Sequence, residues 1–154
     1  MRRDSIPSLL CFAVLAALAA HRANPTFKSV ALGAVGGFFA AGLCLWLLGL
    51  LLCFFNGAVR KTQGWQGVRG AVSRNFLLII PYTVLALLAD LILGWNASLT
   101  FASAGIMTAG SAAGAELMKM GGGKVANMLL PIIGGMGFTT LWMIASTLLR
   151  NLAR

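Results

Sequence analysis

Five long apolar runs, separated by short polar connections, dominate the pattern of this sequence. They cover about residues 8–21, 30–55, 76–95, 99–118 and 125–149. A helix needs about 20 consecutive apolar residues to cross a bilayer. The run 30–55 has about 26 residues without a charge, which is enough to cross even when tilted. The pattern predicts an all-α fold, a polytopic membrane helix bundle of four to five transmembrane helices, in a single transmembrane domain over residues 1–154.

The first run fits either a membrane helix or a signal peptide. Arg2 and Arg3 precede the apolar stretch that starts at Leu9, and Ala17 and Ala19 have the small-x-small form of a cleavage site. The stretch is also short for a transmembrane span. We expect it to be retained as a short or tilted helix, with a cleaved signal peptide as the alternative.

The composition also favours lipid as the surrounding solvent. Hydrophobic residues make up 59% of the chain and charged residues 10%, against roughly 25% charged residues in soluble domains. The mean hydropathy is +0.89. So few charges would not cover the surface of a soluble fold. The three cysteines lie inside apolar runs without a Cys-x-x-Cys pair, so we expect no disulfide framework, no metal site and no cofactor.

The basic residues lie between the apolar runs. The net charge of +9 comes from twelve Lys and Arg against three acids. Such a balance in a soluble protein would suggest nucleic-acid binding, but this placement is typical of positive-inside topology and of contact with anionic headgroups. We expect no nucleic-acid partner. The most polar stretch, 56–75, is expected to form a basic interfacial loop. Its predicted anionic-lipid contacts are Arg60, Lys61, Trp65, Arg69 and Arg74.

Small residues at four-residue spacing mark several runs as helix-packing surfaces. Gly33 and Gly37 match the Gly-x-x-x-Gly pattern, and Ala41 extends the row. We expect this row to pack within the chain, with self-association as the alternative. The fourth run consists almost wholly of small residues, so it should be buried among helices or between protomers. The predicted packing residues are Gly33, Gly37, Ala41, Gly105, Ala109, Gly110, Ala113, Gly114, Gly134 and Gly135.

The distribution of charge predicts an orientation. The connection 96–98 has no basic residue, whereas 56–75 has four and 119–124 has two. The positive-inside rule places the two basic connections inside. Five spans then put the N-terminus inside and the C-terminus outside, although Arg150 and Arg154 on the outside violate the rule. A fourth or fifth run that only dips into the bilayer would remove this conflict. The compact size and short loops suit a bacterial inner membrane.

Two acids are candidates for an ion or proton site, because an ionisable residue inside a span is costly. Asp90 is the only acid within a hydrophobic span, and Thr83 lies on the same helical face. A proton or cation site is one interpretation. The interpretation we favour is an interfacial carboxylate that is hydrated or paired with a loop arginine. Glu116 lies three residues before Lys119, which predicts a local ion pair, with a role in coupling or gating as the alternative.

No pattern of side chains predicts catalysis, so we expect no enzymatic activity. His21 is the only histidine, and no serine or cysteine belongs to a recognised nucleophile motif. The first hypothesis is a structural or assembly subunit of a homo- or hetero-oligomeric membrane complex. The alternative is a small oligomeric transporter or channel that uses Asp90 and the Gly-rich helices to line a polar pathway. Pro131 and the nearby glycines should kink or break the fifth run. Broken helices and buried acids such as Asp90 are features of substrate pathways. Expected partners are the bilayer, with its anionic headgroups, and this chain itself or another membrane protein.

Overall fold

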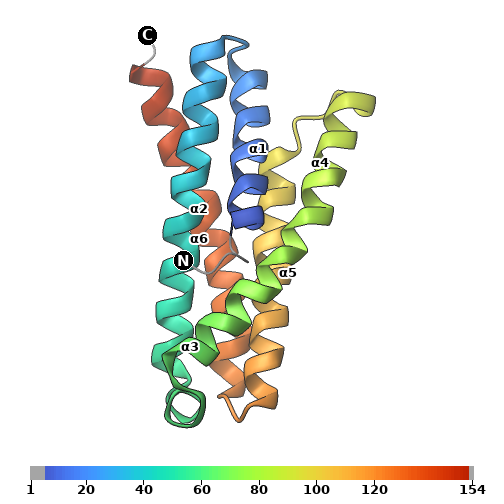
Figure 1. Ribbon diagram of the computed structural model, residues 1–154. Helices are drawn as coiled ribbons and strands as arrows, with labels where there is room; N and C mark the ends of the chain where they lie inside the picture. The colour runs from blue at the N-terminus through green and yellow to red at the C-terminus, as the bar shows by residue number, and fades with distance from the viewer. Residues whose placement is uncertain (1–5, 153–154) are drawn as a thin grey trace.

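The computed structural model describes residues 6–152, which form a bundle of helices without a strand (Figure 1). The elements in chain order are α1 (Ile6–Ala23), α2 (Phe27–Phe55), α3 (Gly57–Asn75), the short 3-10 turn η2 (Phe76–Leu78), α4 (Ile79–Leu93), α5 (Ser98–Lys119) and α6 (Lys124–Leu152). Arg2, Arg3 and Arg154, which enter the topology prediction, lie outside the described residues.

Four helical stretches are long and apolar enough to cross a membrane. They are Ile6–Ala23, Phe27–Phe55, Gly57–Leu93 and Lys124–Ile144. The predicted membrane helix bundle is therefore confirmed, and the chain is an integral membrane protein. α5 runs beside these helices through the bundle (Figure 1). It has 22 residues, a length of about 33 Å, but its small side chains make it less hydrophobic than the other four.

The two ends of the bundle differ in their connections. Figure 1 shows the α1–α2 and α4–α5 connections at the upper end, together with the C-terminal end of α6. The lower end holds α3 and the turn between α5 and α6, where Gly121 adopts a φ of 92°. A positive φ of this kind costs little only for glycine.

Helix α3 is the largest departure from the sequence prediction, because residues 57–75 are helical where we expected a basic loop. The helix bends at Gly64, whose φ of 67° and ψ of 177° are accessible mainly to glycine. The part before the bend lies across the lower end of the bundle (Figure 1). The part after the bend buries Val68, Ala71 and Val72 and continues through η2 into α4. This helical spacing of apolar residues outweighs the four glycines of the stretch.

The Gly-x-x-x-Gly row of α2 packs against α1 of the same chain. A Cβ built on Gly33 would lie 2.6 Å from Ala20 Cβ, and one on Gly37 would lie 2.3 Å from Ala16 Cβ. Ala41, the third member of the row, is 1% exposed. The two helices approach each other through small residues on both sides, which is the close packing that replaces hydrophobic driving force in lipid.

Helix α6 is continuous from Lys124 to Leu152 with Pro131 inside it, so of the predicted kink or break the break does not occur. Proline has no N–H, so the carbonyl of Asn127 lacks its usual helical donor. α5 packs closely against α6 at this position. A Cβ on Gly114 would lie 2.3 Å from the Asn127 carbonyl oxygen, and one on Gly110 would lie 2.9 Å from Pro131 Cβ. The glycines of α5 therefore accommodate the irregular surface around the proline.

Candidate functional site

Asp90 lies in the last turn of α4 and forms an ion pair with Arg22 in the last turn of α1. Arg22 Nε donates to Asp90 Oδ1 at 2.6 Å, and Arg22 Nη2 donates to the Asp90 backbone carbonyl at 2.9 Å. Asp90 is 9% exposed. The arginine thus engages both the side chain and the backbone of the residue, a two-point contact that fixes α1 against α4. This geometry supports a structural carboxylate at the upper end.

Thr83 does not join this pair. It is buried on α4, and its hydroxyl donates to the carbonyl of Ile79 at 3.0 Å. A threonine bonded to its own helix in this way satisfies its donor without a partner from another helix. The two residues predicted to form a cation site therefore have separate hydrogen-bond partners. Asp90 binds Arg22, and Thr83 binds the backbone of its own helix.

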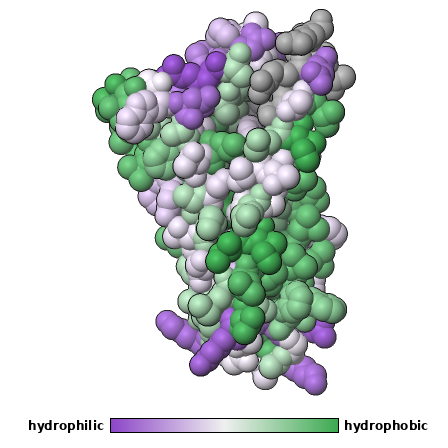
Figure 2. Space-filling view, turned by 180° about the vertical axis from the view of Figure 1, so that it is seen from behind, coloured by the Kyte–Doolittle hydropathy of each residue, from purple (hydrophilic) through white to green (hydrophobic). Residues whose placement is uncertain are grey.

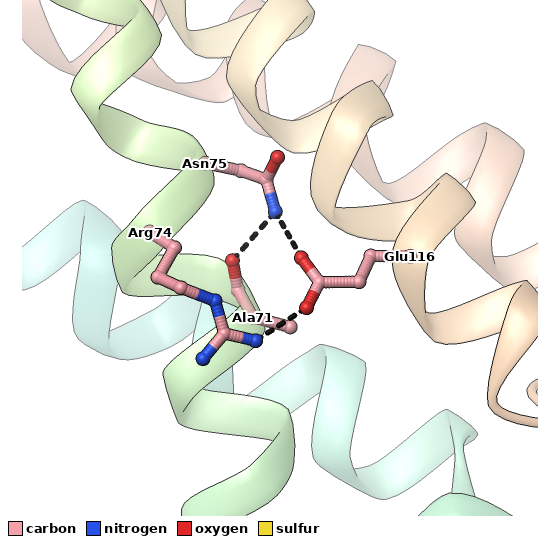
Figure 3. A network of polar contacts seen from close by, with 4 residues as sticks. All are labelled: Ala71, Arg74, Asn75 and Glu116. Carbon is pink, nitrogen blue, oxygen red and sulfur yellow. Dashed lines mark hydrogen bonds and ion pairs between the residues drawn. The ribbon is translucent and has the colours of Figure 1, made fainter.

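Glu116 of α5 binds α3 rather than Lys119, which corrects the predicted local pair. Figure 3 shows its carboxylate between Arg74 and Asn75. Arg74 Nη2 donates to Oε1, and Asn75 Nδ2 donates to Oε2 at 2.6 Å. The same Asn75 nitrogen donates to the Ala71 carbonyl at 2.8 Å. Both carboxylate oxygens are used, so Glu116 anchors the lower end of α5 to α3, which carries four basic residues.

A third polar contact, which the sequence did not reveal, joins the end of α2 to the start of α6. Asn56 and Asn127 exchange two amide hydrogen bonds, each 2.8 Å long, and both are 1% exposed. Asn56 Nδ2 also donates to the Leu52 carbonyl at 2.7 Å. A Cβ on Gly122 would lie 2.3 Å from Asn56 Oδ1. The turn between α5 and α6 therefore closes over the amide pair, and only glycine fits there.

The inner face of α5 is built from the small residues predicted to pack. Ala109 and Ala113 are fully buried. A Cβ on Gly105 would collide with Ile79 of α4, since it would lie 1.9 Å from Cδ1. The two glycines predicted on α6 differ: a Cβ on Gly135 would lie 2.3 Å from Met107 Cγ, whereas one on Gly134 would lie at an ordinary 3.6 Å from Leu48 Cδ1.

The outer face of α5 is exposed and lacks the bulky side chains of a lipid-facing surface. Its exposed residues within the bilayer-spanning length are Thr100, Met107, Thr108, Ser111 and Ala115. On α5, Met107 is the one large hydrophobic residue that is exposed, whereas α2 exposes ten along its length, including Phe39, Leu43 and Leu51. Figure 2, which views the molecule from behind, shows a pale band of weakly polar residues between greener surfaces. We call these five α5 residues the outer face of α5.

Hydroxyl pairs border this outer face on both sides. Thr108 Oγ1 and Tyr82 Oη of α4 lie 2.7 Å apart. Ser103 Oγ and Thr139 Oγ1 of α6 lie 2.6 Å apart. Ser111, between them, donates to the Met107 carbonyl at 2.7 Å. These five hydroxyls have partners within the chain, so the surface beside them presents small and weakly polar atoms.

The residues predicted to contact anionic lipid all lie on α3, but they do not act alike. Arg60, Lys61, Trp65 and Arg69 are exposed, whereas Arg74 is engaged by Glu116. The purple groups at the lower end of Figure 2 are hydrophilic residues of this end of the bundle. Six of the described cations lie on α3 and at the α5–α6 turn, against one acid, Glu116.

The described part of the chain offers little space or chemistry for a buried site. No three His, Cys, Asp or Glu side chains among residues 6–152 lie close enough to hold a metal ion. A cavity between α1, α5 and α6 has a volume of about 10 Å³, close to the minimum for one water molecule. Ser98, which lines it, has a buried hydroxyl oxygen without a hydrogen-bond partner.

The fold and these contacts define a class, a polytopic membrane protein whose helices are joined by small residues and, among the described residues, by polar contacts near the two ends and by hydroxyl pairs along α5. Comparison with protein-family models, with curated proteins and with solved structures finds no match. The functional argument therefore rests on the chemistry of the molecule's own surfaces.

Proposed function

We propose that this protein is a structural or assembly subunit of a homo- or hetero-oligomeric membrane complex, and that the outer face of α5 is the surface that docks another helix. The observation that carries the proposal is the exposure of small and hydroxyl-bearing residues on this face, where a lipid-facing helix would carry large apolar side chains. Small residues gain little from contact with acyl chains, but they let another helix backbone approach closely.

The inner face of α5 shows what such residues do within the same molecule. Gly110 and Gly114 bring α5 into backbone contact with α6, and Ala109 and Ala113 are fully buried between helices. Thr108, Ser111 and Ala115 repeat the same small-residue character on the opposite side of the helix. We infer that α5 is a central helix of an assembly, packed on one side within the chain and on the other by a neighbour.

The alternative, a small transporter or channel, has less support. Asp90 is engaged by Arg22 through two hydrogen bonds, and Thr83 is bonded to its own helix. The cavity between α1, α5 and α6 holds one water at most. We also propose that the protein has no enzymatic activity of its own, since the sequence has a single histidine, His21, and no recognised nucleophile motif.

The charge distribution supports an orientation in the membrane. We propose that the lower end, with six described cations and one acid, faces the cytoplasm, and that the upper end with the Arg22–Asp90 pair faces outward. A bacterial inner membrane remains our proposed location, because the connections between helices are short.

The proposal is tested by the mass of the purified full-length protein in mild detergent. We expect a complex larger than one chain, formed with copies of itself or with a co-purifying membrane protein. Ser111→Leu, on the outer face of α5, should reduce this complex to the monomer. Gly36→Leu on α2 is the matched control, because a Cβ at Gly36 would meet no atom within 4 Å. A wild-type monomer without a co-purifying partner would contradict the proposal.

A further inference from the structure

A pocket opens on the surface between α2 and α3, close to the lower end of the bundle. It is lined by Leu45, Trp46 and Gly49 of α2 and by Trp65 and Arg69 of α3. Its volume is about 60 Å³, several times that of the cavity between α1, α5 and α6. Two features of the chain make room for it: the bend of α3 just before Trp65, and the absence of a side chain at Gly49, where a Cβ would meet nothing within 4 Å.

The charge of Arg69 is not balanced by a described acid. The described part of the chain contains two carboxylates, and both are engaged elsewhere, Asp90 by Arg22 and Glu116 by Arg74 and Asn75. Arg69 is exposed at the edge of the pocket. A guanidinium group presents a planar fork of donors that matches the oxygens of a phosphate. Arg69 therefore offers the pocket an anion-binding group whose ligand must come from outside the described residues.

The remaining lining suits the part of a lipid next to its phosphate. Trp46 and Trp65 are both exposed at the pocket, Trp46 by 56% and Trp65 by 42%. Tryptophan is enriched at the depth where headgroups meet acyl chains. Leu45 and Gly49 form an apolar wall along α2. The pocket thus has one cationic end, two amphipathic aromatic sides and an apolar extension.

We propose that this pocket is a binding site for the phosphate headgroup of an anionic phospholipid, with Arg69 on the phosphate and the start of an acyl chain along Leu45 and Gly49. The site differs from general attraction of a basic surface to anionic lipid, which Arg60 and Lys61 would also provide, because it depends on one arginine and on the shape beside it. Basic pockets between membrane helices bind anionic headgroups in this manner. The proposal does not depend on the oligomeric state.

The test is native mass spectrometry of the purified full-length protein, titrated with phosphatidylglycerol and, separately, with phosphatidylcholine of the same chain length. We expect one phosphatidylglycerol to bind more tightly than phosphatidylcholine. Arg69→Gln should weaken phosphatidylglycerol about five-fold, the effect of roughly 1 kcal/mol per basic residue near an anionic surface. Lys61→Gln, which removes the same charge outside the pocket, should have a smaller effect. Gly49→Leu should also weaken binding, because its side chain fills the pocket without changing the charge.

Three results would overturn the proposal. The first is equal affinity for the two lipids. The second is an equal effect of Arg69→Gln and Lys61→Gln, which would indicate diffuse attraction to the basic end. The third is saturation of the site by inorganic phosphate at the concentrations that saturate it with lipid, which would make a soluble anion the ligand. A loss of binding in Arg69→Lys that is smaller than the loss in Arg69→Gln would support a contact in which both the charge and the fork of the guanidinium group contribute.

Discussion

The neighbouring residues Gly36 and Gly37 on α2 provide a sharp test of the packing between α1 and α2. A Cβ at Gly37 would lie 2.3 Å from Ala16 Cβ and 2.9 Å from the Phe12 carbonyl oxygen, whereas a Cβ at Gly36 meets nothing within 4 Å. Carbon atoms in contact lie about 3.5–4.0 Å apart. Gly37→Ala therefore requires α1 and α2 to separate by more than about 1 Å, or the side chains around them to distort.

The expected magnitudes follow from two opposing terms. Replacing glycine by alanine inside a helix stabilises it by up to about 1 kcal/mol, and both variants gain this. Overpacking costs about 1–3 kcal/mol. Only Gly37→Ala has this cost, because only its Cβ would clash with α1. Gly36→Ala should raise the free energy of unfolding slightly, and Gly37→Ala should lower it by up to about 2 kcal/mol. The difference between the two alanine variants measures the close contact by itself.

Unfolding in mixed micelles, with sodium dodecyl sulfate as the denaturant, is the suitable assay, because it keeps the chain in an apolar environment throughout. Both variants should retain the helical content of the wild type before the transition. If Gly37→Ala is as stable as Gly36→Ala, then α1 does not pack on Gly37 at the observed distance and the arrangement of the first two helices is incorrect.

Three further predictions concern the polar contacts, and each is measured as a change in the free energy of unfolding in the same assay. Asp90→Asn and Arg22→Gln should each destabilise the protein by about 1–3 kcal/mol, and the double variant should cost less than their sum, because the second substitution removes a group already left without its partner. Asn127→Ala should lower the free energy of unfolding by about 0.6–1.7 kcal/mol, the average to maximum measured for hydrogen bonds between membrane helices. Adding Asn56→Ala to this variant should have little further effect. Additive losses would show that the amide pair is not formed. Gly122→Ala should destabilise by about 1–3 kcal/mol through the clash with the Asn56 oxygen, and a neutral result would contradict the closed turn.

The sequence predicted the helices well where a single property extends over many residues. The run expected over 30–55 is helix α2 (Phe27–Phe55), and the small-residue run 99–118 is α5 (Ser98–Lys119). Long apolar stretches determine a membrane helix almost irrespective of their neighbours, since unpaired backbone groups are too costly in lipid. The glycine-rich basic stretch 56–75 was misread, because the burial of Val68 and Ala71 against the bundle depends on tertiary packing that composition does not show.

The polar contacts were predicted only in part, because their partners are remote in sequence. Arg22 and Asp90 are 68 residues apart, and Glu116 is 42 residues from Arg74. The sequence predicted that Asp90 would be hydrated or paired with a loop arginine near the interface, but it did not identify Arg22 as the partner. Glu116 was assigned to Lys119 because helical spacing reveals neighbours on the same helix and not those on another one.

Helix α5 connects the fold to the proposed function. Its inner face allows backbone contact with α6 through Gly110 and Gly114, and its lower end is held by the Glu116 contacts with α3. A helix held so rigidly presents its outer face in one orientation. A fixed surface of small residues loses little conformational entropy when a second helix docks, which is the physical basis for the assembly role that we propose.

The most direct test of the docking surface is photo-crosslinking in the membrane of the organism that makes the protein. A photoreactive amino acid is placed at Ser111 on the outer face of α5, and in a second variant at Val35, which is 56% exposed on α2. We predict a protein adduct of defined mass at Ser111 and lipid adducts at Val35. Lipid adducts alone at both positions would show that the outer face of α5 meets only the bilayer, and would contradict the proposed assembly role.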